Sequence, residues 1–394
     1  MPAATDFDLL ILGGGCAGLS LAQHLAESDY RGRVGIVEPR RVYRDDRSWC
    51  FWAPDDESPA GVPVSRRWQS WRFARMNQGV LDCSAAGYSY HYVNSLDFYR
   101  RAVDAISARP NMSLLLGEAV DALESHTGRL LVQTTGGQRL RADQVVDTRP
   151  PGSARLADAV LQQCFVGRVV QLREDSRGRF DPAAVELMTD MRNDRHGLQF
   201  SYVLPFSQQK ALVEVTRFAP VAVAAAQLDQ ELDQLLERRG WQVAGVERSE
   251  AGSLPMGLAP PVRRSAPGVF RAGTGGGALR AASGYGFQRI QSWARACCDS
   301  LGRGGPALSQ RADSARQRYM DGLFLQVLRD QPQLAPQLFE QMASAVPGPV
   351  FVRFMSDRGG WLDSLRVIAS LPRRPFLGSL LRKTGRSAAR LAAP

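Results

Sequence analysis

The chain has 394 residues, 44% of them hydrophobic and 22% charged. This balance argues against a disordered chain, and because no run of 18 apolar residues occurs, no membrane-spanning helix is predicted. The net charge of +10 is carried almost entirely by arginine, while the six cysteines and four histidines lack metal-ligand spacing. We therefore expect reduced thiols and no metal site. The first ten residues lack a basic start, which favours a cytoplasmic protein.

The N-terminal segment predicts a nucleotide-binding unit. A continuous apolar run over 7–12, typical of a buried parallel strand, precedes a segment with helical spacing over 19–27 and a second strand over 34–38. Three glycines with G-x-G-x-x-G spacing lie between the first strand and the helix: Gly13, Gly15 and Gly18. Such glycines let the backbone approach a pyrophosphate, and Glu38, at the end of the second strand, suits the ribose hydroxyls. An acid at this position disfavours a ribose 2′-phosphate.

The next stretch, YRDDRSWCFW (43–52), alternates polar and large aromatic residues. This pattern is typical neither of a plain core strand nor of a solvated loop. It places two acids, an arginine and two tryptophans directly beside the predicted cofactor strand. The segment therefore raises the question of what chemistry needs such residues next to a nucleotide.

Two later segments favour FAD as the cofactor. DQVVDTRPPG (143–152) reads as a strand followed by an Asp-x-Arg turn, and a second glycine cluster, AGTGGGALRAASGYGF (272–287), follows a strand-like VFRAG. FAD is long enough to touch two distant glycine turns, and its flavin end commonly rests against a late one. We expect that end near three glycines of the second cluster: Gly273, Gly276 and Gly277.

The predicted fold class is α/β, with a Rossmann-like FAD-binding domain of the two-domain flavoprotein type. Residues 1–300 are expected to form one body, in which a β-rich substrate part (about 61–110 and 155–255) is interleaved with the FAD-binding part. Residues 301–394 carry apolar residues at helical spacing and predict a helical lid or membrane-docking region.

Together these segments resemble the flavin-dependent lycopene cyclase family of carotenoid biosynthesis. Segment 43–52 is similar to the family's run of Asp-Arg, Ser or Thr, and then Trp-Cys-Phe-Trp. The resemblance continues in order along most of the chain through these further segments: QCFVGRVV (163–170), FDPAAVELMTDMR (180–192), SYVLPFSQQKALVEVT (201–216), LPMGLAPP (254–261) and RFMSDRGGWLDSLRVIASLPRRPFL (353–377). A single shared glycine motif does not account for a likeness of this extent.

The resemblance implies a lycopene beta-cyclase, an isomerase that closes the linear ends of lycopene into beta-ionone rings. The reaction has no net redox change but requires FAD in its reduced form, with NAD(P)H as reductant. Protonation of a terminal double bond gives a tertiary cation, an inner double bond attacks it, and proton loss completes the ring. The expected partners are lycopene or a related linear carotene and a membrane surface, and no nucleic acid; no oligomeric state is predicted.

Glu214 is the expected acid–base residue. Strand alternation in ALVEVT (211–216) places Leu212, Glu214 and Thr216 on one face. In an apolar tunnel the pKa of this carboxyl would rise, so that it keeps the proton a general acid needs. The alternative is a solvent-facing strand glutamate.

The aromatic residues of segment 43–52 are then expected to stabilise the carbocation, because aromatic faces do so without reacting with it. We expect Asp46 and Arg47 to hold the segment against the cofactor or the backbone, with Arg47 among the cofactor-binding residues and Asp46 among those on the substrate side. The aromatic residues expected to stabilise the cation are Trp49, Phe51, Trp52 and Tyr285. The alternative is that the tryptophans only pack a domain interface.

Two departures from the family pattern leave ring type and exact substrate open. Val215 stands where some members carry a second acid, and residues 281–285 read AASGY. The rival function is an FAD-dependent monooxygenase or a prenyl or polyene reductase on the same fold, which would oxidise NAD(P)H stoichiometrically with substrate. The basic region 366–390 predicts peripheral attachment to the inner membrane.

Overall fold

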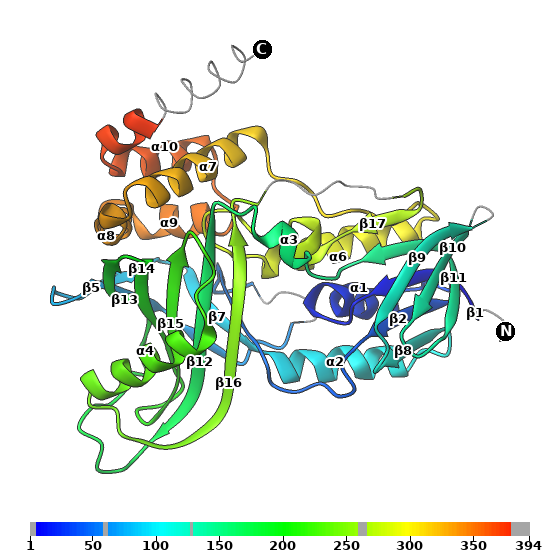
Figure 1. The fold of residues 1–394 in the computed structure, drawn as a ribbon, viewed down its shortest axis with the longest axis horizontal. Coiled ribbons are helices and arrows are strands. Elements are labelled where there is room, and N and C mark those ends of the chain that lie inside the picture. Colours follow the sequence, from blue (N-terminus) through cyan, green and yellow to red (C-terminus); the bar gives the residue numbers. More distant parts are fainter. Residues whose placement is uncertain (1–4, 58–61, 127–128, 259–265, 380–394) are drawn as a thin grey trace.

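The computed structural model describes residues 5–57, 62–126, 129–258 and 266–379. The first sheet has the strand order β8-β2-β1-β11-β10-β9, with β17 paired to β11 (Figure 1). Its strands have these bounds: β1 Thr5–Leu12, β2 Val34–Glu38, β8 Met112–Leu116, β9 Val120–His126, β10 Arg129–Thr134, β11 Arg139–Asp147 and β17 Val269–Arg271. The pairings of β8, β2, β1, β11 and β17 are parallel, which confirms the Rossmann-like core of the predicted α/β fold.

Strand alternation in β1 gives this sheet two buried faces. Leu9 and Ile11 pack against helices α1 (Cys16–Ala26), α2 (Ser95–Ser107) and α6 (Phe287–Gly302). Leu10 and Leu12 belong to a second core built with the antiparallel strands β9 to β11. The apolar run that identifies β1 in the sequence therefore reflects burial on both sides, as parallel strands require.

The second sheet has the order β16-β12-β15-β14-β13-β5-β6. Its strands have these bounds: β5 Ser70–Arg75, β6 Leu81–Ser84, β12 Leu161–Leu172, β13 Ala184–Asp194, β14 Gly197–Pro205, β15 Lys210–Ala219 and β16 Val243–Met256. Helix α4 (Ala225–Arg238) covers one face, where Val213 and Val215 are buried. The other face carries the aromatic side chains that surround the cavity described below.

A three-stranded sheet, β3-β7-β4, lies between these two units. Its strands are β3 (Ser48–Pro54), β4 (Arg66–Trp68) and β7 (Tyr88–Asn94). β3 contains the second half of the aromatic segment, residues 48–52, so the alternation seen there is that of a strand packed between two different units. Trp49 packs in the core of the first unit, whereas Trp52 belongs to the core of the second.

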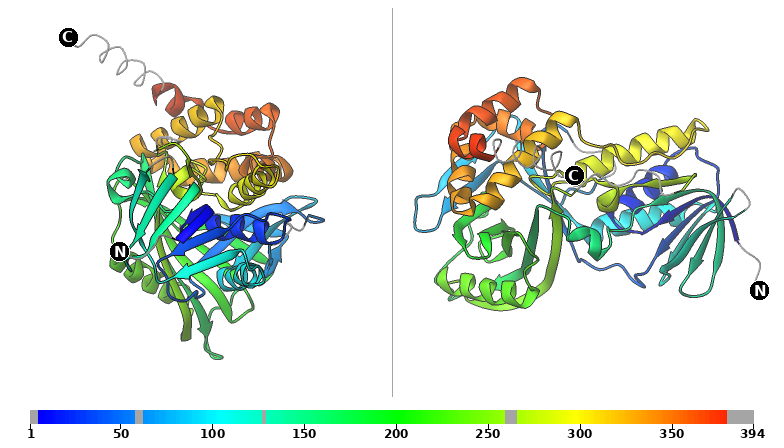
Figure 2. Two further views of the ribbon diagram at one scale, coloured as in Figure 1. Left: turned by 90° about the vertical axis from the view of Figure 1, so that its right-hand side faces the viewer. Right: turned by 45° about the horizontal axis from the view of Figure 1, so that its top comes forward.

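Helices of the C-terminal region gather at one end of the second sheet, above it in Figure 1 and brought forward in the right-hand view of Figure 2. They are α7 (Ala315–Asp330), α8 (Ala335–Ala345), α9 (Gly348–Met355) and α10 (Trp361–Ser370). Two shorter helices, α3 (Ser153–Leu156) and α5 (Gly273–Gly276), and a 3₁₀ turn (Pro332–Leu334) complete the described elements. The predicted helical region is thus confirmed, while the domain boundaries near residues 61, 110, 155, 255 and 300 stay a prediction.

Candidate active site

A cavity of about 1070 Å³ runs between the two units. At one end it is lined by the turn before α1 and by the late glycine turn; at the other it is lined by the second sheet and helices α7 to α10. Aromatic and aliphatic side chains make up most of its substrate end: Phe73, Phe165, Leu187, Phe200, Phe218, Phe324, Phe339 and Phe351. An apolar chamber of this kind, open to a nucleotide-binding turn, suits an apolar substrate brought against a bound cofactor.

The turn before α1 is shaped for close backbone approach. Gly13 has φ of +101°, and a Cβ added at Gly18 would lie 1.9 Å from the Gly13 carbonyl oxygen, so neither position accepts a side chain. Gly15 precedes the first turn of α1, caps it with no side chain, and lines the cavity. The N-terminus of α1 therefore faces the cavity with its amides, as a pyrophosphate site requires.

The late glycine turn lies directly beside the first one. A Cβ at Gly273, where φ is +64°, would stand 3.0 Å from the Ala17 Cβ atom. Gly273 and Thr274 line the cavity together with Thr148 of the Asp-x-Arg turn. Gly276 instead packs against the Arg271 carbonyl, and Gly277 is the left-handed cap of α5, so these two glycines shape the turn behind the wall. We call the surface of Gly13–Gly18, Thr148 and Gly273 the cofactor cradle.

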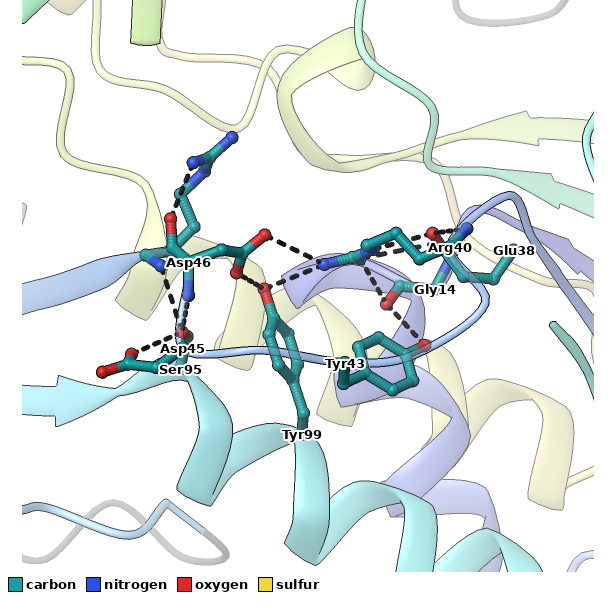
Figure 3. Close-up of polar contacts among 9 residues, drawn as sticks. Gly14, Glu38, Arg40, Tyr43, Asp45, Asp46, Ser95 and Tyr99 are labelled. Carbon is teal, nitrogen blue, oxygen red and sulfur yellow. Dashed lines mark hydrogen bonds and ion pairs between the residues drawn. The ribbon is translucent and has the colours of Figure 1, made fainter. Parts of the chain in front are cut away.

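Glu38 is buried at the end of β2 and accepts three close hydrogen bonds. Gly14 N–H donates to its Oε2 at 2.6 Å, and Arg40 donates to its Oε1 from the backbone at 2.9 Å and from Nε at 2.7 Å (Figure 3). Arg40 also donates to the Gly14 carbonyl at 3.0 Å and lines the cavity. Arg40 is therefore a cationic residue beside the cradle that the sequence analysis missed, although its position two residues after Glu38 could have indicated it.

The two adjacent acids of the aromatic segment point to different units. Asp46 accepts from the Tyr99 hydroxyl at 2.9 Å and pairs with Arg40 at 3.4 Å, on the cofactor side (Figure 3). Asp45 accepts from Ser95 at 3.0 Å and pairs with Arg248 of the second sheet at 2.9 Å. Asp46 therefore lies on the cofactor side of the cavity wall, and its expected role toward the substrate stays a prediction.

Arg47, expected at the cofactor, lines the cavity and donates from its guanidinium to the Asp46 carbonyl at 2.7 Å. Its backbone N–H and that of Asp46 both donate to the Ser95 hydroxyl, at 3.1 and 3.0 Å. These bonds fix the path of the chain at the point where it leaves the cofactor cradle for β3.

The aromatic residues of β3 differ in whether they reach the cavity. Trp52 lines the cavity and packs against Tyr90 and Tyr285, with ring centroids 4.8 and 5.3 Å away. Trp49 also reaches the cavity and stacks on Phe287 at 5.6 Å. Phe51 lies away from the cavity, buried between His91 and Phe287. Phe51 is therefore a packing residue, contrary to the expected cation-stabilising role, because the rings of His91 and Phe287 lie against it in the core of the first unit.

A chain of tyrosine hydroxyl groups crosses the substrate end. Tyr90 Oη lies 3.0 Å from Tyr202 Oη and 3.1 Å from Tyr285 Oη. All three rings line the cavity, which places the expected residue Tyr285 on its wall, next to Trp52. Each of these buried hydroxyls therefore has a hydrogen-bond partner within the tyrosine chain, as buried polar groups require.

Glu214 lies at the centre of β15, 8% exposed, on the cavity wall. Its Oε1 accepts from the Thr216 hydroxyl at 2.5 Å, while Val213 and Val215 point to α4 on the opposite face. Burial first, and then the nearby Glu250 carboxyl, raise the pKa of Glu214 to about 8 against the opposing effects of Thr216 and Arg248. Glu214 is therefore buried rather than solvent-facing and holds a proton at neutral pH.

Glu250 is a second buried carboxyl that sequence reasoning missed. It lies on β16, and both Glu214 and Glu250 are register partners of Gly167 on β12, one from each side. Glu250 pairs with Arg248 at 2.9 Å, and Arg248 in turn donates to Ser48 at 2.6 Å. No local pattern signals this contact, because it depends on which strands flank β12.

These features define the class of the protein. Solved structures with this fold include a geranylgeranyl bacteriochlorophyll reductase-like protein from Thermoplasma acidophilum, with a TM-score of 0.62 at 10% identity, covering 95% of this chain and 98% of that one. A p-nitrophenol 4-monooxygenase from Pseudomonas putida DLL-E4 gives a TM-score of 0.57 at 14% identity, with coverage of 95% and 99%. The fold is thus the two-domain FAD-binding fold of such monooxygenases and reductases.

The family is narrower than the fold. The family model described as "Lycopene cyclase protein" matches residues 8–381, and the chain belongs to this family. It is similar to the lycopene beta-cyclase of Pseudescherichia vulneris, with 26% identity covering 94% of this chain and 95% of that protein. It is also similar to the lycopene beta-cyclase of Paracoccus sp., with 28% identity covering 95% and 96%. The family resemblance seen in the sequence is thereby confirmed.

Proposed function

We propose that this protein is a lycopene beta-cyclase that closes the linear ends of lycopene, or of a related linear carotene, into beta-ionone rings. Family membership and the curated relatives support this activity. The single observation that carries it is Glu214, a buried carboxyl that keeps its proton on the wall of an apolar cavity reaching the cofactor cradle. An alkene is protonated only by an acid that is still protonated at working pH and reaches it without water between.

Glu214 donates its proton to the terminal double bond of the polyene, which leaves a tertiary cation. The inner double bond attacks that cation and closes the six-membered ring, and loss of a proton from the ring restores a neutral product. Protons gained and lost balance, so the reaction consumes no electrons. Trp52 and Tyr285 belong to the cavity wall, where aromatic rings stabilise positive charge without forming a bond to it.

FAD is the cofactor that fits the cradle. Gly13, Gly15 and Gly18 would leave room for its pyrophosphate, and Glu38 and Arg40 would bind its ribose and phosphate groups. When bound and reduced, the flavin supplies a negative charge that stabilises a cation in the cavity. NAD(P)H is the proposed source of the electrons that keep it reduced.

The cavity opens toward an apolar surface. Ile368, Leu371 and Leu377 line its outer part, and α10 exposes Trp361, Leu362 and Leu365 beside them. Three arginines of the same region are exposed: Arg366, Arg373 and Arg374. Exposed apolar residues flanked by cations are the features that bind an anionic bilayer surface.

We therefore propose that the cytoplasmic face of the inner membrane is the site at which this protein collects its carotene. Among the described residues, no helix is long and apolar enough to cross a membrane. Residues 380–390 of the expected basic region lie outside the described part of the chain.

Expression in a lycopene-accumulating host, followed by chromatography of the pigments, tests the proposed activity. We expect lycopene to be replaced by a product with cyclic ends. Unchanged lycopene in cells that contain flavin-loaded protein would contradict the proposal. Stoichiometric NAD(P)H consumption with an oxygenated or saturated product would indicate the rival monooxygenase or reductase.

A further inference from the structure

We infer that Glu250 is a positioning residue that keeps the catalytic proton on Glu214 by holding a fixed negative charge beside it. This inference deepens the proposed function and rests on it. Glu250 lies outside the set of residues that line the cavity, so it acts through Glu214 rather than on the substrate.

Gly167 lies between the two carboxyl residues in the second sheet. In the order β16-β12-β15, Gly167 of the middle strand has Glu250 as its partner on one side and Glu214 on the other. Directly paired residues of antiparallel strands point to the same face, so both carboxyls stand over the same position of the sheet. Gly167 places no side chain between them, and a Cβ added there would lie 3.3 Å from the Glu214 Cβ atom.

The two carboxyls have different partners. Glu250 is buried and forms an ion pair with Arg248 at 2.9 Å. Glu214 receives a neutral hydroxyl from Thr216. Two buried carboxyls this close do not both ionise, and the one that holds the cation ionises first. Burial raises the pKa of Glu250 as well, and the Arg248 guanidinium acts against that rise. Because Arg248 forms its ion pair with Glu250 and not with Glu214, we assign the proton of the pair to Glu214.

Arg248 is itself held in place. Its Nε pairs with Asp45 at 2.9 Å, its Nη2 donates to Ser48 at 2.6 Å, and its side chain is 9% exposed. Both partners belong to or adjoin the aromatic segment that leaves the cofactor cradle. The position of Arg248 beside Glu250 is therefore held by the same residues that connect the cofactor unit to the substrate sheet, which gives Asp45 a role in the pair.

The surroundings of the pair leave few other sources for a shift in its titration. The polar and titratable groups that face it come from β3, β14, β15, β16 and the loop before β3: Asp45, Arg47, Ser48, Cys50, Tyr202, Thr216 and Arg248. Burial raises the pKa of the Tyr202 hydroxyl well above its ordinary value and that of the Cys50 thiol to about 12, so both stay neutral at working pH. The charged groups near Glu214 at neutral pH are thus Glu250, Arg248 and the neighbours of Arg248, Asp45 and Arg47.

The test is an infrared titration of flavin-loaded protein, which follows the C=O stretch of a protonated carboxyl and needs no substrate. The band assigned to Glu214 is the one missing from Glu214→Gln. Glu250→Gln removes the neighbouring negative charge, so the pH midpoint of that band should fall by about one pH unit or more. Arg248→Gln removes the cation, so the last proton of the pair should leave at higher pH than in the parent.

Opposite shifts in these two variants support the inference. Glu247→Gln is the matched control, because it is the same substitution on the same strand at an exposed residue paired with Lys210 at 2.6 Å. A midpoint in Glu250→Gln that is unmoved, or that moves no further than in Glu247→Gln, would overturn the inference. Because the band is measured without carotene, a clear shift in a protein that forms no ring would contradict the proposed function instead.

Discussion

Asp45 and Arg248 form an ion pair at 2.9 Å that joins the loop after the second cofactor strand to the edge strand of the substrate sheet. Asp46, its neighbour, pairs with Arg40 at 3.4 Å beside the cofactor cradle. Two consecutive acids therefore connect the cofactor position on one side and the Glu250–Glu214 pair on the other. This arrangement brings an acid that keeps its proton to the same cavity as the flavin, which is the condition for protonating an unactivated alkene.

Gly18→Ala should abolish flavin binding. The new Cβ would lie 1.9 Å from the Gly13 carbonyl oxygen, and that contact is relieved only if the backbone of the cradle moves. Purified protein should lose its flavin absorbance and regain none on incubation with FAD. Gly245→Ala is the control, since a Cβ there meets nothing within 4 Å. Equal flavin content in the two variants would argue against the cradle.

Trp52→Leu should lower the rate of ring formation far more than Trp52→Phe. Both changes remove volume from the same buried site, but only the phenylalanine keeps an aromatic face. A cation–π contact of about 1–2 kcal/mol corresponds to a loss of roughly 5- to 30-fold in rate. Turnover of flavin-loaded, reduced protein with lycopene measures the difference. Equal rates in the two variants would show that Trp52 only packs.

Phe51→Leu should instead reduce stability and leave turnover intact. Phe51 is 3% exposed and stacks on Phe287 at 5.3 Å in the core of the cofactor unit. We expect a loss of roughly 1–2 kcal/mol in the free energy of unfolding, as for other losses of packing in a core. Urea denaturation and the turnover assay together check this prediction. A loss of turnover without a loss of stability would instead support the cation-stabilising role first expected for Phe51.

Stability should depend on pH through Glu214. Because its pKa is raised in the folded state, to about 8, the folded protein binds more protons than the unfolded chain between the unfolded value of about 4.3 and pH 8. The stability contribution is full below the unfolded pKa and is lost as the pH rises to the folded one. Glu214→Gln should flatten this decline, by at most about 1.4 kcal/mol per pH unit. Parallel pH curves for parent and variant would contradict the raised pKa.

Replacing Leu362 and Leu365 with Gln should weaken binding to anionic vesicles while leaving flavin content unchanged. Both side chains are at least half exposed on α10 beside the cavity mouth. Val246→Gln is the control, because Val246 is 49% exposed and lies in the first part of β16, toward the end of the second sheet away from helices α7 and α8. Co-sedimentation that falls equally in both proteins would remove α10 from the docking surface.

The sequence correctly predicted those secondary-structure elements that depend on residues close together in the chain. The apolar run of β1, the spacing of Gly13 to Gly18 and the helical spacing after residue 301 follow from near neighbours in the chain, and the structure confirms the elements they predict. Alternation around Glu214 correctly separated its face from that of Val213 and Val215, because a long central strand imposes a strict period of two.

Contacts between segments that are far apart in the sequence could not be predicted from it. Glu250 lies near Glu214 only because β16 and β15 both flank β12, and the sequence of neither strand indicates which strand pairs with it. The different positions of Phe51 and Trp52 depend on which unit lies on each side of β3. The contacts of Asp46 could not be predicted for the same reason, since its partners Arg40 and Tyr99 come from two other segments.

The central claim is that Glu214 supplies the proton, and its substitution by Gln tests this most directly. The amide is nearly isosteric, so Glu214→Gln should keep fold and flavin yet lose ring formation by a factor of 10² to 10⁴, the usual contribution of a general acid. Glu214→Asp should keep a small part of the activity, because the acid remains but sits about one methylene further from the substrate. Turnover of lycopene by reduced, flavin-loaded Glu214→Gln within about threefold of the parent would contradict the account.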